Sequence, residues 1–136
     1  MKFYDQTEFT DKENNKHGNC LSACLASLLN IELELVPNFC YYETNEWHRK
    51  FVEFIFNNKY NFEGTFNFTL WHKWKELLEF SNGIDGVFIG VGISPRFKDV
   101  YHAVLYKDNE LLFDPHPSRS GIEELKYVYI IEKLNE

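Results

Sequence analysis

The chain has 136 residues, enough for one domain that buries a core without disulfide or metal staples. Hydrophobic residues make up 44% of it and aromatic residues 18%, which is a globular composition and not a disordered one. The 21 acidic residues outnumber the 14 basic ones, the formal net charge is −7 and the basic residues form no stripe, so the sequence disfavours nucleic-acid binding.

Targeting and membrane signals are not found in the sequence. The first residues, MKFYDQTEF, contain neither a basic region nor a long apolar one, and no later window approaches roughly 18 consecutive apolar residues. We therefore expect a cytoplasmic protein with no membrane partner. The absence of repeats, low-complexity tracts and linkers predicts a single domain over 1–136, while the oligomeric state is not indicated. The odd, sparse set of three cysteines predicts free thiols.

The first predicted element is a helix from Cys20 to Asn30. Apolar residues recur there at helical spacing, and Asn19 is a suitable N-cap. The residues at 34–36 are predicted to be extended because Pro37 disfavours a helical conformation in the residue before it.

Two further helices are predicted, from Asn45 to Asn58 and from Leu70 to Phe80, with their aromatic residues in the core. After Gly83 the sequence changes to short β-branched and aromatic runs at 87–93, 100–106, 110–113 and 126–131, which predict strands. Helices followed by strands indicate an α+β fold, with N-terminal helices packed on a C-terminal antiparallel sheet. The two glycines of Gly90-Val91-Gly92 indicate a strand that another chain segment approaches closely.

Cys20 is the candidate nucleophile. It stands at the first turn of the predicted helix, where unpaired backbone N–H groups and the helix dipole favour a thiolate. The alternative is that Cys20 and Cys24, one turn apart, are two small buried hydrophobic residues.

A predicted β-hairpin supplies the partners of this cysteine. His102 begins one strand and Asp114 follows the next, with a turn over 107–110 between them. The two side chains share a face only if directly opposed residues have an even index sum, which requires a three-residue loop or a bulge. Asn109 tolerates the left-handed conformation that such a loop uses, and a two-residue loop at 108–109 would count against the pair. On that condition Asp114 orients His102, and His102 acts as the base for Cys20. Separately, His102 could be a satisfied core histidine, and Asp114 could belong only to a turn.

This order of a cysteine at a helix start, a strand histidine and an acid on the next strand resembles the papain-like cysteine peptidase superfamily. More narrowly, five short motifs are similar to those of a group of small, uncharacterised bacterial and phage proteins: DQT at 5–7, GNC at 18–20, SPR at 94–96, HAV at 102–104 and DPHPS at 114–118. The resemblance implies a papain-like fold and a Cys20–His102–Asp114 triad that needs no cofactor. It also implies an oxyanion side chain before the nucleophile, with Gln6 as first candidate and Asn15 as second.

The polar loops after the strands are expected to border the cleft. Arg96, His116 and Arg119 are candidates for substrate binding, because a guanidinium can hold a carboxylate or phosphate. The predicted activity is that of a cysteine-dependent hydrolase or acyltransferase acting on a peptide, a protein or a small amide or ester. The sequence does not separate peptidase, amidase, deamidase and transglutaminase-like outcomes.

Two alternatives from other classes remain. The first is a metal site formed by His102, Asp114 and His116 with His72 or His17, although the sequence contains no HxxxH helix or paired CxxC motifs. The second is a catalytically inert papain-like module that binds a protein partner as an inhibitor.

Overall fold

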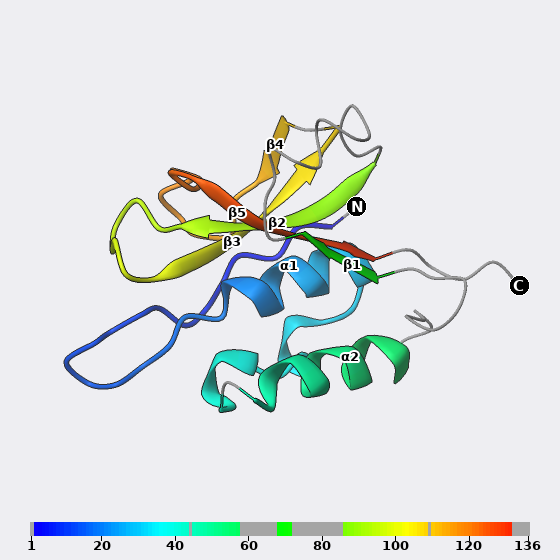
Figure 1. The fold of residues 1–136 in the computed structure, drawn as a ribbon, viewed down its shortest axis with the longest axis horizontal. Helices are drawn as coiled ribbons and strands as arrows, with labels where there is room; N and C mark the ends of the chain where they lie inside the picture. The colour runs from blue at the N-terminus through cyan, green and yellow to red at the C-terminus, as the bar shows by residue number, and fades with distance from the viewer. Residues whose placement is uncertain (1, 44, 58–67, 72–85, 109, 132–136) are drawn as a thin grey trace, which may run out of the picture.

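A five-stranded antiparallel sheet forms one side of the molecule, and helices cover one of its faces (Figure 1). The computed structural model describes residues 2–43, 45–57, 68–71, 86–108 and 110–131. Its elements are listed in chain order: α1 (Cys20–Leu29), the short 3-10 helices η1 (Leu33–Leu35) and η2 (Phe39–Tyr41), α2 (Trp47–Asn57), β1 (Phe68–Trp71), β2 (Val87–Ile93), β3 (Tyr101–Lys107), β4 (Glu110–Phe113) and β5 (Leu125–Ile131). The strand order is β1-β5-β2-β3-β4. The predicted α+β class is confirmed.

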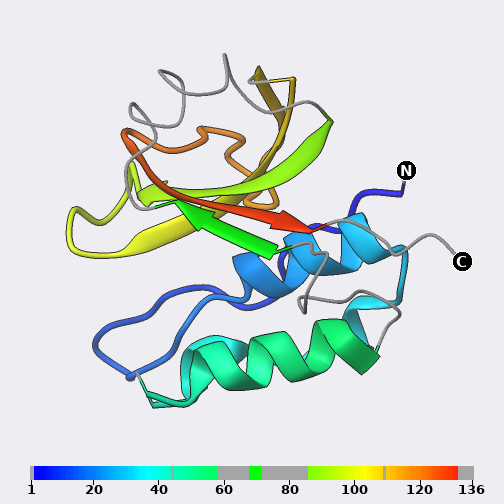
Figure 2. The same cartoon turned by 45° about the vertical axis from the view of Figure 1, so that its right-hand side comes forward.

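The helix α1 lies between the sheet and α2, as the turned view in Figure 2 shows. Eight of its ten residues are buried, and a helix that is apolar on all sides belongs in a core. Its two buried serines are satisfied by backbone carbonyls: Ser22 donates to Pro37 at 2.6 Å, and Ser27 donates to Ala23 at 2.9 Å. A fixed central helix places its first residue, Cys20, at a fixed point beside the sheet.

Every second residue along the central strands faces α1. Ile89 and Val91 of β2, Ala103 and Leu105 of β3, and Tyr129 of β5 join the core cluster that contains α1. Their neighbours Phe88 and Val128 form a second cluster, with Phe88 stacked on Tyr106 at 5.4 Å between ring centroids. Strand alternation divides the apolar residues between these two clusters.

The predicted close approach of another backbone segment is confirmed at Gly92 but not at Gly90, where the close atoms belong to side chains. A Cβ atom at Gly92 would lie 2.0 Å from the backbone oxygen of Glu124, beside a register shift between β2 and β5. A Cβ atom at Gly90 would instead meet the Tyr106 ring at 2.7 Å.

Three local predictions were wrong. Leu70 and Trp71 belong to β1, which pairs with β5, so no helix begins at Leu70; the remainder of the predicted helix, 72–80, lies outside the described residues. A short apolar pattern does not distinguish a helix from a strand, and here the pairing with β5 supplies the backbone hydrogen bonds of a strand. Glu34 and Leu35 belong to η1, and only Val36, the residue before Pro37, is extended.

Asn19 is the third. It precedes α1 but its side chain makes no capping hydrogen bond. Instead Oδ1 accepts from the N–H groups of Thr7 and Glu8, each at 2.9 Å, and Nδ2 donates to the Thr7 hydroxyl at 3.0 Å. Asn19 therefore fastens the N-terminal segment to the start of α1, a long-range role that local capping rules do not predict.

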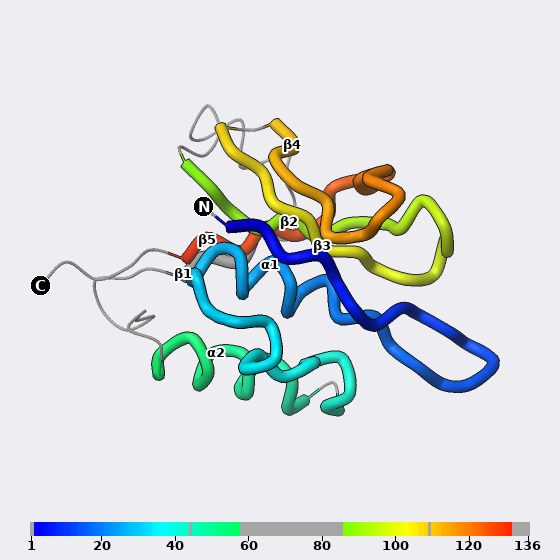
Figure 3. Tube along the Cα trace, turned by 180° about the vertical axis from the view of Figure 1, so that it is seen from behind, coloured from blue at the N-terminus to red at the C-terminus, as the bar shows by residue number. Residues whose placement is uncertain are grey.

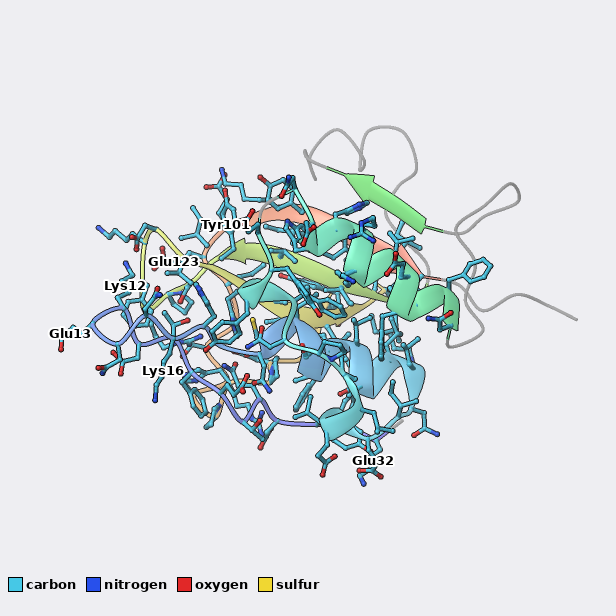
Figure 4. All side chains as sticks on the ribbon, turned by 90° about the horizontal axis from the view of Figure 1, so that it is seen from below. Lys12, Glu13, Lys16, Glu32, Tyr101 and Glu123 are labelled. Atoms are coloured by element: carbon cyan, nitrogen blue, oxygen red, sulfur yellow. The ribbon has the colours of Figure 1, made fainter. Side chains whose placement is uncertain are left out.

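The N-terminal segment crosses α1 and β3 before turning back into the helix, as the rear view in Figure 3 shows. Its loop extends beyond the body of the molecule, with Lys12, Glu13 and Lys16 at the end that also carries Tyr101 (Figure 4). Lys12 forms an ion pair with Asp99 and lies over the Phe97 ring. These contacts hold the N-terminal loop against the loop between β2 and β3.

No single helix in the described part of the chain is long and apolar enough to cross a membrane. Only α1 together with the segment Leu33–Tyr41, bent by 113°, reaches that length and composition.

Candidate active site

The hairpin of β3 and β4 brings His102 and Asp114 together. Lys107 is opposite Glu110, so the turn has two residues, and the numbers of opposed residues here have an odd sum. A bulge then shifts the register, leaving Leu112 without an opposite residue, and Leu105 is opposite Phe113 with an even sum. The bulge thus meets the condition that the turn alone fails. Asn109, the residue expected to be left-handed, lies outside the described residues; its neighbour Asp108 has φ 50°.

Asp114 is buried and its carboxylate accepts three hydrogen bonds. Oδ1 accepts from His102 Nε2 at 2.6 Å and from the His116 backbone N–H at 2.9 Å, and Oδ2 accepts from the Gly121 N–H at 2.7 Å. Burial acts to raise the pKa of Asp114, but the hydrogen bond from His102 and the two backbone donors outweigh it and lower the pKa. Asp114 is therefore an ionised orienter that fixes the direction of the His102 ring.

His102 lies between the carboxylate and the thiol, and only 3% of it is exposed. With Nε2 held by Asp114, Nδ1 is the ring nitrogen left for Cys20, whose sulfur accepts from the N–H of the next residue, Ala103. Burial disfavours the charged ring, yet the hydrogen bonds to Asp114 and Cys20 and their negative charges raise the pKa of His102 to about 9. The ring is held as an imidazolium at neutral pH.

Cys20 begins α1 and is buried. Its sulfur accepts a hydrogen bond from the Ala103 N–H at 3.4 Å. Burial opposes the thiolate, but the hydrogen bond and charge of His102, together with the N–H groups of Ala103 and Leu21, lower the pKa of Cys20. The two shifts together favour a thiolate–imidazolium pair.

The other two cysteines lack this environment. Burial raises the pKa of Cys24 well above its ordinary value. Cys40 is exposed as a residue, but burial of its thiol group and the charge of Cys20 raise its pKa to about 12. All three thiols are free, as predicted.

Gln6 lies beside the helix start. It is 6% exposed, and its Nε2 donates to the Glu8 carbonyl at 2.9 Å, while its Oε1 is buried without a partner. Gly18 makes room for it, since a Cβ atom there would lie 3.2 Å from Nε2. Asn15, by contrast, stands in the exposed turn of the loop between Asp11 and Lys16 and does not line the site. Of the two oxyanion candidates, the structure brings only Gln6 to Cys20.

Segments far apart in the sequence meet around this centre. The Gln6 N–H donates to Pro115 at 2.9 Å, and the Arg96 guanidinium donates to the Ser118 hydroxyl at 3.0 Å. Ser94 orders the intervening loop, because its hydroxyl accepts from the N–H of Arg96 at 3.1 Å. The short motifs at the N-terminus, after β2 and after β4 therefore form one wall.

Two cavities open at Cys20. The first, the polar cavity, has a volume of about 120 Å³ and includes Gln6, His17, Arg96 and His116 in its lining. The second, the aromatic groove, has a volume of about 550 Å³. Its described lining includes six aromatic residues: Phe39, Tyr42, Trp47, Tyr101, Tyr127 and Tyr129.

Sequence reasoning missed this groove, because the aromatic residues of the α2 region were assigned to the core. Phe51 of α2 is buried as expected, whereas Trp47 of the same helix lines the groove. The described lining comes from α1, η2, α2 and the three strands β2, β3 and β5, so no local pattern in the sequence predicts it.

The three candidates for substrate binding do not all reach the polar cavity. Arg96 and His116 line the polar cavity. Arg119 does not: its guanidinium pairs with Asp5 and donates to the Asp114 carbonyl, both at 2.6 Å. Arg119 therefore ties the N-terminal segment to the loop after β4.

Among the described residues, no group of three or more His, Cys, Asp or Glu side chains is arranged to hold a metal ion; His72 lies outside them. Comparison of the chain with models of protein families, with curated proteins and with solved structures gives no match.

Proposed function

We propose that the protein is a cysteine-dependent hydrolase or acyltransferase that acts on an amide, isopeptide, ester or thioester through a papain-like Cys20–His102–Asp114 triad. The observation that carries the proposal is the buried hydrogen bond between His102 and Asp114, with the Cys20 thiol beside the same ring at the point where two cavities meet. A nucleophile, a base in contact with it and an orienter behind the base are the three parts that covalent catalysis needs.

In the first half-reaction the Cys20 thiolate attacks the substrate carbonyl and forms a carbon–sulfur bond. The carbonyl electrons move to oxygen, and we assign the Cys20 backbone N–H at the first turn of α1 and the Gln6 amide, which line the same cavity, as the donors that stabilise it. As the tetrahedral intermediate collapses, the His102 imidazolium gives its proton to the leaving amine or alcohol. The products are a thioester on Cys20 and a neutral His102.

In the second half-reaction His102 takes a proton from water or from an acceptor amine, which attacks the thioester. Collapse expels the Cys20 thiolate and restores the ion pair. Hydrolysis and acyl transfer differ only in the acceptor, so the same three residues serve both.

The test is selective chemical labelling. Iodoacetamide at neutral pH is expected to alkylate Cys20 at least about tenfold faster than Cys24 or Cys40, because the lowered pKa of Cys20 supplies thiolate. In the denatured protein the three rates are expected to converge, and His102→Ala is expected to slow Cys20 in the folded protein. Equal rates in the folded protein would contradict an activated nucleophile.

Turnover separates an enzyme from an inert binding module. Wild-type protein is expected to release p-nitrophenol from p-nitrophenyl acetate and to carry an acetyl group on Cys20, detected by intact mass spectrometry. Cys20→Ala is expected to do neither. An acetylated Cys20 that never turns over with water or added amines would contradict the catalytic proposal.

A further inference from the structure

The two cavities that meet at Cys20 and His102 differ in charge: the first includes the guanidinium of Arg96, and the described lining of the second has no charged side chain apart from the catalytic pair. Both include Cys20, Cys40, Tyr101 and His102 in their linings, so a group bonded to the reacting carbon enters one or the other. The nature of each lining therefore bears on what the enzyme accepts.

The polar cavity carries positive charge in an acidic protein. No Asp or Glu appears among its described lining residues, although the chain has a formal net charge of −7. Arg96 lines it with a guanidinium that has no carboxylate partner in the described part of the chain and holds only the Ser118 hydroxyl. Its charge reaches the neighbouring His116, whose ring also lines the cavity. A free guanidinium beside histidines is suited to a carboxylate.

The aromatic groove has no charged side chain among its described lining apart from the catalytic pair itself. Phe39 and Tyr129 are buried in its walls, with 1% and 5% exposed, while Tyr42 and Tyr101 are 37% and 53% exposed. Aromatic walls of this kind gain free energy by removing apolar surface from water. The volume of about 550 Å³ is in the range of sites that hold small organic groups.

We propose that the substrate carries a bulky aromatic or aliphatic group on one side of the reacting carbonyl and a carboxylate on the other. The aromatic groove takes the first and Arg96 in the polar cavity takes the second. This inference rests on the proposed function, because it places both groups relative to Cys20 as the nucleophile. It narrows the substrate to amphiphilic acyl compounds that bear an anion, such as acylated amino acids or peptides with a free carboxylate near the scissile bond.

Three alkylating agents test the two sides separately. Iodoacetate brings a carboxylate to Cys20, N-(2-phenylethyl)iodoacetamide brings an apolar ring, and iodoacetamide brings neither. In each case the thiolate forms a carbon–sulfur bond and iodide leaves. The measurement is the second-order rate constant at Cys20, by mass spectrometry, expressed as a ratio to iodoacetamide in the same variant. Taking the ratio removes the effect of any change in the intrinsic reactivity of Cys20.

For the polar side, Arg96→Gln is expected to lower the iodoacetate ratio about fivefold, while Arg96→Lys keeps most of it. The matched control is Lys98→Gln, which removes an exposed positive charge two residues away outside both cavities and is expected to change nothing. The His102 charge also attracts iodoacetate, but it is present in every variant. An unchanged ratio in Arg96→Gln would overturn the anionic half of the proposal.

For the apolar side, Tyr42→Ala and Trp47→Ala are each expected to lower the phenylethyl ratio about tenfold. Phe56→Ala is the control, because Phe56 is exposed on α2 and absent from the groove lining. Ratios that equal the control would overturn the apolar half. If iodoacetamide itself fails to prefer Cys20 in the wild type, the proposed function fails; if Cys20 is preferred and only the ratios do not respond, the substrate class alone is wrong.

Discussion

His102 Nε2 lies 2.6 Å from Asp114 Oδ1 across a hairpin whose two-residue turn would by itself place the two side chains on opposite faces. The bulge at Leu112 reverses the parity of the register, so that both reach the same side. One unpaired residue in β4 therefore decides whether the base has an orienter.

Asp114 is expected to act through His102 and not on substrate. Asp114→Asn keeps the size of the side chain but removes the charge that holds the imidazolium, so we expect turnover of p-nitrophenyl acetate to fall about a hundredfold or more. The alkaline limit of the pH profile is expected to move downward from about 9, because the Asp114 hydrogen bond and charge raise the pKa of His102. A fall in rate with an unmoved alkaline limit would show that Asp114 only maintains the fold.

The proposed activity of the wild-type protein is expected to persist well above the ordinary pKa of histidine. Departure of the leaving group needs the protonated ring, and the pKa of His102 is raised from 6.5 to about 9. Acylation is therefore expected to be near its maximum at pH 7–8, half-maximal near pH 9 and small above it. Stopped-flow measurement of acylation by an acyl p-nitroanilide, whose amine leaves only with that proton, checks the limit across this range, and a loss of activity centred near pH 6.5 would contradict the ion pair.

Gln6 is expected to contribute to the oxyanion site. Gln6→Ala removes the side-chain donor, and we expect kcat to fall about a hundredfold with little change in KM. The rate of Cys20 alkylation by iodoacetamide is the control, because that reaction develops no oxyanion and is expected to be unchanged. Asn15→Ala, in the exposed turn, is expected to retain full turnover. An equal loss in both variants would remove Gln6 from this role.

Gly18 is expected to support Gln6 indirectly. A Cβ atom at position 18 would crowd Gln6 Nε2 at 3.2 Å and the Glu8 carbonyl at 3.3 Å. We expect Gly18→Ala to lower turnover several-fold while the folded protein keeps its Cys20 reactivity toward iodoacetamide. Turnover equal to wild type would show that the N-terminal segment moves aside without affecting the site.

The two glycines of β2 are expected to differ in their effect on stability. At Gly92 a Cβ atom would meet backbone, the Glu124 oxygen at 2.0 Å, so Gly92→Ala must displace the chain where it enters β5 and is expected to lower the free energy of unfolding by about 4 kcal/mol. At Gly90 the obstacle is the side chains of Tyr106 and Leu125, which can adjust, so Gly90→Ala is expected to cost about 1–2 kcal/mol. Chemical denaturation of both variants measures the difference, and equal losses would contradict this account of the bulge.

Local sequence patterns were sufficient to predict the α+β class, the helix that begins at Cys20 and the strands that carry His102 and precede Asp114. Each depends on short-range chemistry: apolar spacing in α1, β-branched and aromatic runs in the sheet, and unpaired N–H groups at a helix start. Because these signals are local, they also identified the three residues of the proposed triad as candidates.

How these candidates come together depends on packing between distant segments of the chain. The bulge in β4, the contact of Asn19 with the N-terminal segment and the selection of Gln6 over Asn15 all depend on partners distant in the sequence. The same holds for β1, which pairs with β5 where local spacing favoured a helix, and for the aromatic groove, whose described lining comes from six elements. The physical reason is that register, long-range hydrogen bonds and cavities arise from packing between segments, which no local pattern encodes.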